Sequence, residues 1–501
     1  MASTPCSPLN SLLRTVPRRY RVPPLGDRDA RSDAPSAARN LAVAIELARA
    51  ALARGEQPDA AVKARFLQGL ARLIADALHP QTGDPAFQAM VLRHRHAWVR
   101  EYASLQAQGD KDARHIRSRV DAIAHPGKLR QQASGPLRDG LSQLYEQVST
   151  GAWTEAADTG RFLLAGLETR SDPLFDLQST AGLGRSLQHL LQDPALARLQ
   201  RLLALAHDTD VQHYLALWAS HGPRSGSAEA AAQGASAQQR GAEVEATAAQ
   251  ALDALAAQLN RDDSQQWTYR VVTALHVPAV LVDSAERAKT EWDVAVFRRP
   301  KIEDAKETEG AKKAEAAKKT DAAASPPWDI CLLVEAKASA DAATTDFPRL
   351  LRGLQLLSKA DAHVIYPFLT KQGTVPVRGR SLHALPTTDA LATFQDAVLY
   401  CSDAPADPAP KPLGAASRMQ LISSTNTLDY ASRLSDGEAV NAQDLEPVWQ
   451  TLLTDPRWLT VLNQYATLRR VRELMVHVAD LHALSRRTIS NPISTTDSAG
   501  R

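Results

Sequence analysis

Two acidic side chains and one amine stand where this chain could bind a metal ion or an anion. Glu335 and Lys337 close the apolar run 330–337, and Asp293 lies within a second apolar run, 292–297. Side chains alternate between the two faces of a strand, so Glu335 and Lys337 project from the same face. Charges in such a place are costly unless they pair or bind something. An Asp and a Glu together can hold a hard cation, and a nearby Lys can orient a water molecule or stabilise charge on a phosphate.

The segments around these residues follow a definite order. Apolar spacing predicts one helix first, then a series of strands, a second helix and further strands. The helices are expected over 242–260 and 347–360, and the strands over 269–272, 279–282, 292–298, 328–336, 363–369 and near 397–400.

This order, with an Asp on one strand and Glu-Ala-Lys at the end of the next, resembles the PD-(D/E)XK phosphodiesterase superfamily, which has the restriction-endonuclease-like fold. The resemblance covers 241–369, about a quarter of the chain. It implies that Asp293 and Glu335 hold a divalent metal, Mg²⁺ or Mn²⁺, with the backbone carbonyl of Ala336 as a further ligand. It also implies that Lys337 positions or activates the attacking water.

The same resemblance extends to residues outside the motif. The opening helix of this family often carries a metal-assisting Glu, and the Gly-x-x-x-Glu spacing from Gly241 favours Glu245 over Glu243 in the catalytic set. A Gln in the helix after the Lys contacts nucleic acid in some members, and Gln355 matches it. The residues expected near the nucleic acid are Gln355, Arg349, Arg352, Arg378 and Arg380.

Two departures and one alternative stand beside this interpretation. Trp292 takes the place of the family's Pro before the Asp, and a long charged insert separates the two site strands. Long surface insertions are well tolerated thermodynamically. The alternative is that Glu335 and Lys337 form an exposed ion pair contributing a few tenths of a kcal/mol.

The predicted fold is multidomain and mostly α-helical, with a central α/β restriction-endonuclease-like core, a mixed sheet flanked by helices, between helical N- and C-terminal domains. Composition shifts and turn signals place the boundaries. The expected parts are a disordered basic arm (1–36), a helical N-terminal domain (37–221), a linker (222–241), a nuclease-like domain (242–402) with a charged, partly helical insert (301–327), a helical C-terminal region (403–490) and a disordered tail (491–501).

Composition limits the possible environments and partners. The 501 residues are 44% hydrophobic and 23% charged, and the net charge of +2 means that any nucleic-acid surface is a local patch. One candidate is 93–130, which has nine basic and four acidic residues; the alternative is a solvated helix face. The three cysteines lack the spacing of a disulfide framework or a zinc site, which favours a reducing, cytoplasmic setting. No stretch of the sequence approaches the roughly 18 apolar residues of a membrane span. The alternative for 1–26, rich in arginine, is an organelle transit peptide.

The leading hypothesis is a metal-dependent nuclease, with DNA favoured over RNA, in bacterial defence or DNA processing, and with a possible protein partner for the helical domains. Two alternatives remain open. One is a nucleic-acid-binding protein that kept the fold and lost turnover; the other is a helical interaction scaffold in which the acid and amine side chains do not converge.

Overall fold

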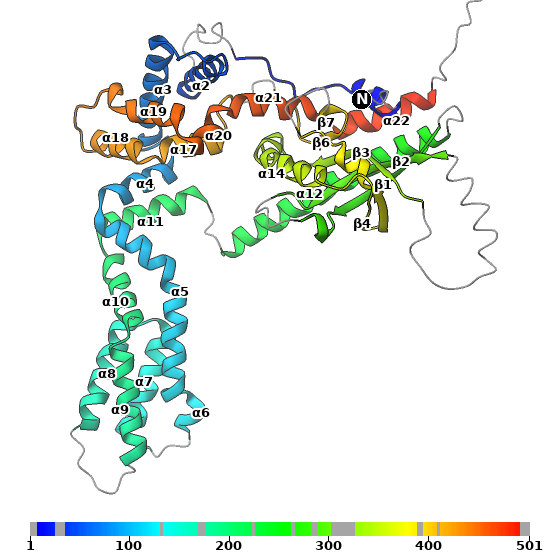
Figure 1. Cartoon of the computed structure of the whole chain (residues 1–501). Helices are drawn as coiled ribbons and strands as arrows, with labels where there is room; N and C mark the ends of the chain where they lie inside the picture. Colours follow the sequence, from blue (N-terminus) through cyan, green and yellow to red (C-terminus); the bar gives the residue numbers. More distant parts are fainter. Residues whose placement is uncertain are drawn as a thin grey trace, which may run out of the picture. The chain divides into compact units, whose positions relative to one another are not determined.

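The chain forms two compact units, each built from separated stretches of sequence (Figure 1). In the computed structural model, unit 1 comprises Met1–Leu70, Gly226–Gln420 and Trp449–Arg501, and unit 2 comprises Ala71–Ser225 and Leu421–Val448. The structure describes residues 8–25, 36–130, 134–168, 177–222, 226–261, 266–282, 288–301, 326–387, 394–407 and 411–490. The expected boundary at 221 lies close to the break between Ser225 and Gly226, whereas the expected boundaries at 37 and 403 fall inside unit 1, which is discontinuous in sequence.

Unit 2 is helical, as the spacing of its apolar residues predicts. Asp84 and Asp193 each cap a helix whose first residue is proline. An Asp followed by Pro is a typical sequence signal for the start of a helix, so these two starts can be predicted from the sequence. Leu141, Leu144 and Leu196 belong to its larger apolar core. The helices of this unit are the end of α3 (Ala60–Leu78), α4 (Pro85–Arg95), α5 (Ala97–Ala124), α6 (Pro126–Leu129), α7 (Pro136–Thr150), α8 (Trp153–Glu168), α9 (Leu177–Leu191), α10 (Pro194–Ala206), α11 (Thr209–His221) and α18 (Thr425–Ser435), followed by the 3₁₀ turn η3 (Ala442–Leu445).

Unit 1 contains a mixed seven-stranded sheet, so the predicted mostly helical fold with one mixed, helix-flanked sheet is confirmed at this level. The strand order is β5-β4-β1-β2-β3-β6-β7. Strands β1 to β3 are antiparallel, and β6 and β7 continue parallel to β3. The strands are β1 (Trp267–His276), β2 (Glu291–Pro300), β3 (Asp329–Ala336), β4 (Ile365–Thr370), β5 (Gly373–Arg378), β6 (Val398–Ser402) and β7 (Met475–His477).

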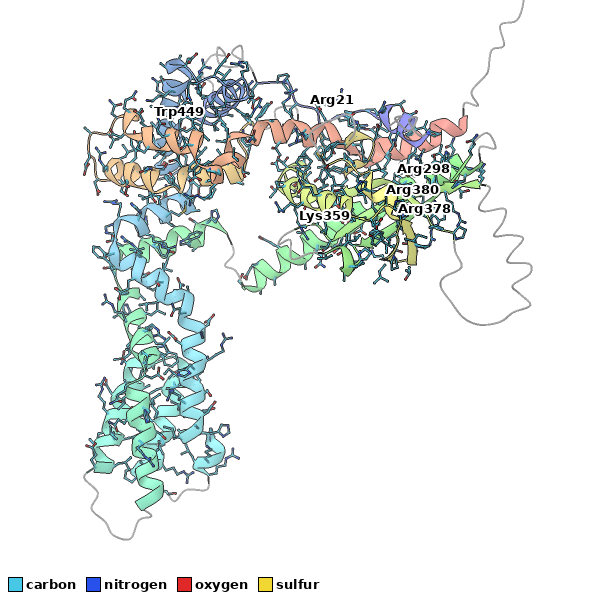
Figure 2. The ribbon with its side chains drawn as sticks, in the orientation of Figure 1. Arg21, Arg298, Lys359, Arg378, Arg380 and Trp449 are labelled. Atoms are coloured by element: carbon cyan, nitrogen blue, oxygen red, sulfur yellow. The ribbon has the colours of Figure 1, made fainter. Side chains whose placement is uncertain are left out.

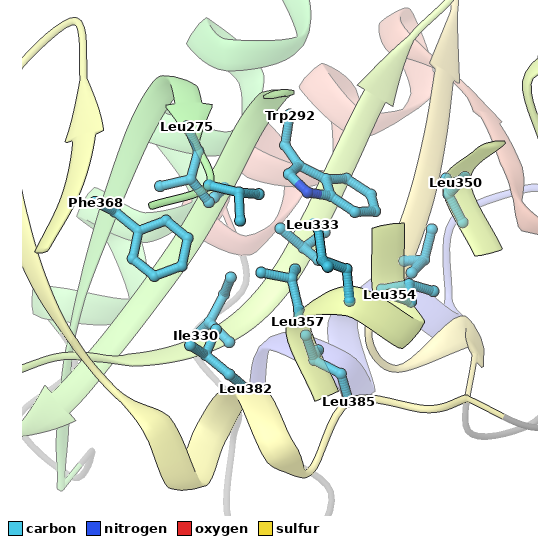
Figure 3. Close-up of a cluster of buried hydrophobic side chains, with 14 of the residues drawn as sticks. Leu275, Trp292, Ile330, Leu333, Leu350, Leu354, Leu357, Phe368, Leu382 and Leu385 are labelled. Atoms are coloured by element: carbon cyan, nitrogen blue, oxygen red, sulfur yellow. The ribbon is translucent and has the colours of Figure 1, made fainter. Parts of the chain in front are cut away.

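Helices cover both faces of this sheet. On one face, α12 (Ala228–Arg261) buries Val244 and Leu252 against Val294 and Val334. On the other face, α14 (Ala340–Ser358) packs against the sheet, and Figure 3 shows its Leu354 and Leu357 beside Trp292 and Leu333. The site residues are therefore held between two well-packed layers.

Most of the remaining helices of unit 1 come from the two end segments of the chain, and a few short ones come from its middle. Helix α2 has Ser36 as its N-cap, and the late helices pack around it and α14. They are α1 (Pro8–Arg14), α2 (Ala37–Ala53), the start of α3, α15 (Gly379–His383), α17 (Ala415–Ile422), most of α19 (Glu446–Thr454), α20 (Leu459–Leu462), α21 (Gln464–Leu474) and α22 (Val478–Ser490), with the 3₁₀ turns η2 (Ala279–Leu281) and η4 (Pro456–Trp458).

Several local predictions were wrong. Part of the expected disordered arm is ordered, because Leu9, Leu13 and Val16 are buried in the core beneath α12. Most of the expected linker 222–241 is helical, since its alanine, glutamine and glutamate residues favour helix and extend α12 back to Ala228. The expected strand 279–282 is a 3₁₀ turn following Pro278.

The strand expected after the second helix is present, and the sheet order shows where it lies. The segment 363–369 forms β4, which pairs with β1 through His276 and Leu369, far from β3. The strand beside β3 is β6, which pairs parallel with it from Leu333 to Ala336. A β4–β5 hairpin thus intervenes in sequence between α14 and the parallel strand. The predicted insert 301–327 and tail 491–501 fall almost wholly outside the described residues.

Candidate active site

The two predicted carboxylates are neighbours across adjacent strands. The β2–β3 ladder pairs Val294 with Val334, so the next residues along the two strands are Asp293 and Glu335. The backbone N–H of Ala336 donates to Asp293 Oδ2 at 2.8 Å. Residues opposite each other in an antiparallel pair share a face of the sheet. The strand pairing itself therefore brings Asp293 and Glu335 together.

Glu335 is fully buried between two lysines. Its Oε2 accepts hydrogen bonds from Lys337 Nζ at 2.9 Å and from Lys289 Nζ at 2.6 Å. Burial raises the pKa of this carboxyl to about 7, with the charge of Asp293 adding to the rise and the two ammonium groups opposing it. The surroundings of Glu335 thus shift the ionisation of its carboxyl to near neutral pH.

Lys337 links the strand end to the following helix. Its ammonium lies 2.9 Å from Glu335 and 3.7 Å from Asp346 Oδ2 on α14, and its side chain is 19% exposed. Burial disfavours the charged form, but the neighbouring carboxylates, Glu335 foremost, outweigh burial and raise the pKa of Lys337. The amine is therefore a cation with partial access to solvent.

Lys289 was not predicted from the sequence. It precedes β2 in a polar stretch, and its side chain is only 7% exposed. Its backbone N–H donates to the Arg349 carbonyl of α14 at 3.2 Å, which fixes the segment against that helix. No local sequence signal distinguishes this lysine from a surface lysine, because its role depends on the packing of α14 over the sheet.

Unpartnered polar atoms gather around the same carboxylate. Among the described residues, Glu335 Oε1, Asp346 Oδ2 and Tyr400 Oη are buried without a hydrogen-bond partner. Tyr400 of β6 stands opposite Glu335 in the β3–β6 ladder. Burial, followed by the nearby carboxylates, raises the pKa of Tyr400 well above its usual value. Buried polar atoms without partners in a protein commonly mark the place of a water molecule or an ion.

The donor set fits a magnesium-type ion. Mg²⁺ commonly takes one or two carboxylates and leaves its other positions to water and substrate. Asp293 and Glu335 supply two carboxylates, and Glu335 Oε1 has no partner within the described residues. A larger cage of three or more His, Cys, Asp or Glu side chains is not found in that part of the chain. The residues therefore suit an ion that binds water and substrate as well as protein.

The predicted fourth acid, Glu245, lies elsewhere. It is on α12, the helix that covers the other face of the sheet, and it pairs with Lys371 of the β4–β5 turn at 3.4 Å. The second choice, Glu243, accepts a hydrogen bond from Gln239 of its own helix at 3.1 Å. The structure therefore brings together Asp293, Glu335 and Lys337, while Glu245 has a different ionic partner.

The predicted nucleic-acid residues fall into two groups. Gln355, Arg349 and Arg352 are exposed on α14, the helix that also carries Asp346. Arg378 and Arg380 lie near each other on unit 1 (Figure 2) and contact Asp329 at 3.5 and 3.3 Å. Asp329 begins β3 and Glu335 nearly ends it, so these arginines are roughly 20 Å from the carboxylate pair along the strand.

The predicted basic patch 93–130 belongs to unit 2, where several of its cations are paired. Arg95 pairs with Asp436, Arg119 contacts Asp193 at 2.7 Å, and Arg117 lies over the ring of Trp153. These contacts favour a structural role for this part of the patch.

The chain matches no protein-family model, no curated protein and no solved structure. No helix in the described part of the chain combines the length and hydrophobicity that crossing a bilayer requires.

Proposed function

We propose that this protein is a metal-dependent phosphodiesterase that cleaves nucleic acid, with DNA the favoured substrate and bacterial defence or DNA processing the favoured role. The observation that carries the proposal is the meeting of Asp293, Glu335 and Lys337 where β2 begins and β3 ends, in the middle of the sheet, with a buried Glu335 oxygen that has no hydrogen-bond partner among the described residues. A phosphodiester is anionic and repels an anionic nucleophile, so its hydrolysis gains from a cation held by carboxylates and from an amine that stabilises negative charge.

Each residue has a distinct part in this proposal. Asp293 and Glu335 would hold the divalent ion, which when bound neutralises phosphate charge and lowers the pKa of its water. Lys337 is the partly exposed cation of the cluster and would orient the attacking water or contact a phosphate oxygen. Asp346, 3.7 Å from Lys337, would keep the amine directed toward the site.

One observation favours a second candidate, a nucleic-acid-binding protein without turnover. Glu335 has no exposed surface, and one of its oxygens is already bonded to two ammonium groups. A site closed in this way can keep its fold without admitting a metal ion. This candidate predicts binding of nucleic acid without cleavage.

A cleavage assay separates the two candidates. Purified protein is incubated with single- and double-stranded DNA and RNA in Mg²⁺ or Mn²⁺, with EDTA as the metal-free control. The proposed function predicts cleavage that EDTA abolishes and that Lys337→Ala removes. Lys359→Ala is the matched control, because Lys359 is an exposed lysine just after α14 (Figure 2). Equal cleavage by wild type and Lys337→Ala would refute the role given to Lys337, and binding without cleavage would establish the second candidate.

A further inference from the structure

Both lysines of the site contact the same oxygen of Glu335. Lys289 Nζ lies 2.6 Å and Lys337 Nζ 2.9 Å from Oε2, whereas Oε1 is buried without a hydrogen-bond partner among the described residues. Two donors on Oε2 fix the rotation of the carboxylate plane and leave Oε1 able to accept a further ligand. The carboxylate is thus held in an asymmetric arrangement.

Lys289 is itself held firmly in place. Its backbone N–H bonds to the Arg349 carbonyl, and its ammonium lies 5.9 Å from the centre of the Trp292 ring. Gly353 of α14 permits the close approach, since a Cβ at that position would lie 2.8 Å from both the Cβ and the carbonyl oxygen of Lys289. A lysine fixed by its backbone, by an aromatic ring and by a glycine contact differs from a mobile surface lysine that happens to reach an acid.

We propose that Lys289 is a positioning residue of this site, which together with Lys337 holds Oε2 of Glu335 so that Oε1 faces the position of a divalent metal ion. The inference rests on the proposed function and adds to it a residue outside the Asp and Glu-x-Lys motif. Groups that orient a metal ligand typically contribute about 10- to 100-fold to metal affinity or activity. Lys337 is the more exposed of the two amines and is assigned to the substrate, whereas Lys289, at 7% exposure, acts only through Glu335.

The test measures metal binding separately from cleavage. Mn²⁺ is titrated into wild type and Lys289→Met by calorimetry and by electron paramagnetic resonance. Methionine keeps an unbranched side chain of similar length and removes the ammonium. We expect the Mn²⁺ dissociation constant to rise about 10- to 100-fold, while the cleavage rate at saturating Mn²⁺ stays within a few-fold of wild type. Lys337→Met should instead lose cleavage even at saturating metal, and Lys359→Met should change neither quantity.

Two further variants keep the test decisive if Lys289→Met does not fold. Lys289→Gln retains a neutral donor and should weaken Mn²⁺ binding in the same direction. Gly353→Ala leaves every charge in place and displaces the Lys289 backbone, so it should also raise the Mn²⁺ dissociation constant. Thermal melting without metal confirms that each variant used in the titrations is folded.

The outcomes distinguish this inference from the proposed function. Unchanged Mn²⁺ affinity in folded Lys289→Met would overturn the inference while leaving cleavage by wild type intact. Tighter Mn²⁺ binding would also overturn it, because it would show that Lys289 competes with the metal for Glu335. If wild type binds Mn²⁺ without cleaving and Lys289→Met weakens that binding, the proposed function fails and the inference stands. Wild type that binds no Mn²⁺ would refute both.

Discussion

The pair of residues that most clearly points to chemistry is Asp293 and Glu335, because it sets two carboxylates side by side in a buried part of the molecule. The Glu-x-Lys spacing and the strand patterns were enough to predict this pair and Lys337. The two residues flank the Val294–Val334 pair of the ladder, so strand register brings them together. Lys289, Asp346 and Tyr400 were not predictable, because they approach Glu335 through the packing of α14 and the pairing of β6.

Asp293→Asn replaces one carboxylate oxygen with an amide nitrogen and so tests whether Asp293 is a metal ligand. Asparagine keeps an oxygen able to accept from the Ala336 N–H, so we expect the melting temperature to stay close to that of wild type. Loss of the negative charge should lower metal-dependent cleavage at least about 100-fold, the upper end for groups that support a metal site. Asp253→Asn, at an exposed position of α12, is the control. Full activity in Asp293→Asn would remove this residue from the site.

The raised pKa of Glu335 predicts a specific pH dependence of stability. Between the usual value of 4.5 and about 7, the folded chain keeps a proton that the unfolded chain has released. The free energy of unfolding should therefore fall as pH rises through that window, by up to about 3 kcal/mol, and this group should add no further change above it. Urea unfolding across the window should show this slope in wild type and its loss in Glu335→Gln.

The same titration predicts the pH dependence of activity. A proton on Glu335 competes with a metal ion for the carboxylate. At limiting Mg²⁺, cleavage should increase as pH rises toward about 7 and then level off. An acid limb near the ordinary glutamate value of 4.5 would contradict the burial of this carboxyl in the working protein.

At the scale of elements, strand β1 has a local distortion beside the site. Ala274 has a φ of 52°, in the left-handed region, and it lies between the Thr273–Val294 and Leu275–Trp292 pairs, opposite Asp293. Gln372 of the β4–β5 turn bonds to Thr273 twice, accepting from its N–H at 3.0 Å and donating to its hydroxyl at 3.1 Å. The β4–β5 hairpin, of which the sequence predicted only the first strand, thus supports the backbone next to Asp293.

Substitution of Ala274 tests this distortion. Ala274→Gly removes the cost of a left-handed conformation, which is roughly 1–2 kcal/mol for an L-residue. The greater freedom of glycine in the unfolded chain opposes this gain, so the free energy of unfolding should change by less than about 1 kcal/mol. Ala274→Val adds a branched side chain at a buried, left-handed position and should destabilise by about 2 kcal/mol or more. Equal stability of the two variants by urea unfolding would show that this backbone conformation is not retained.

Helix α12 offers a second test at this scale. Its first half was expected to be a flexible linker because Gly, Ser, Ala and Gln dominate the segment, yet Ala and Gln are also good helix formers and the structure continues the helix through it. Gly241 has open space around its Cα. Gly241→Ala should therefore stabilise unit 1 by up to about 1 kcal/mol in urea unfolding. A true linker would show no change.

At the scale of the whole molecule, the helical class was predictable and the division into units was not. Helix periodicity is local, whereas the assignment of 1–70 and 449–501 to the same unit as 226–420 depends on contacts between distant segments. The first helix shows the difficulty. Alone it is a short amphipathic segment among arginines and prolines, and only the sheet and α12 give its apolar side chains a place to be buried.

Truncations of side chains in this first helix test its place in unit 1. Leu9 and Leu13 are each 1% exposed. Leu9→Ala and Leu13→Ala should each destabilise by about 2–5 kcal/mol, the usual cost of removing a buried leucine side chain. Ser11→Ala, at an exposed position of the same helix, should leave stability unchanged. If all three variants melt alike, the segment is not part of the folded core, as the predicted disordered arm requires.

The discontinuous units have a consequence for how the protein is made. Synthesis proceeds from the N-terminus, and domains generally fold once their sequence has emerged from the ribosome. Unit 2 lacks α18 until Ser435 has been translated, and the sheet of unit 1 lacks its last strand until His477. The apolar strands around Glu335 therefore lack part of their sheet until most of the chain has been translated, and partly folded chains with exposed apolar surface are prone to aggregate during that interval.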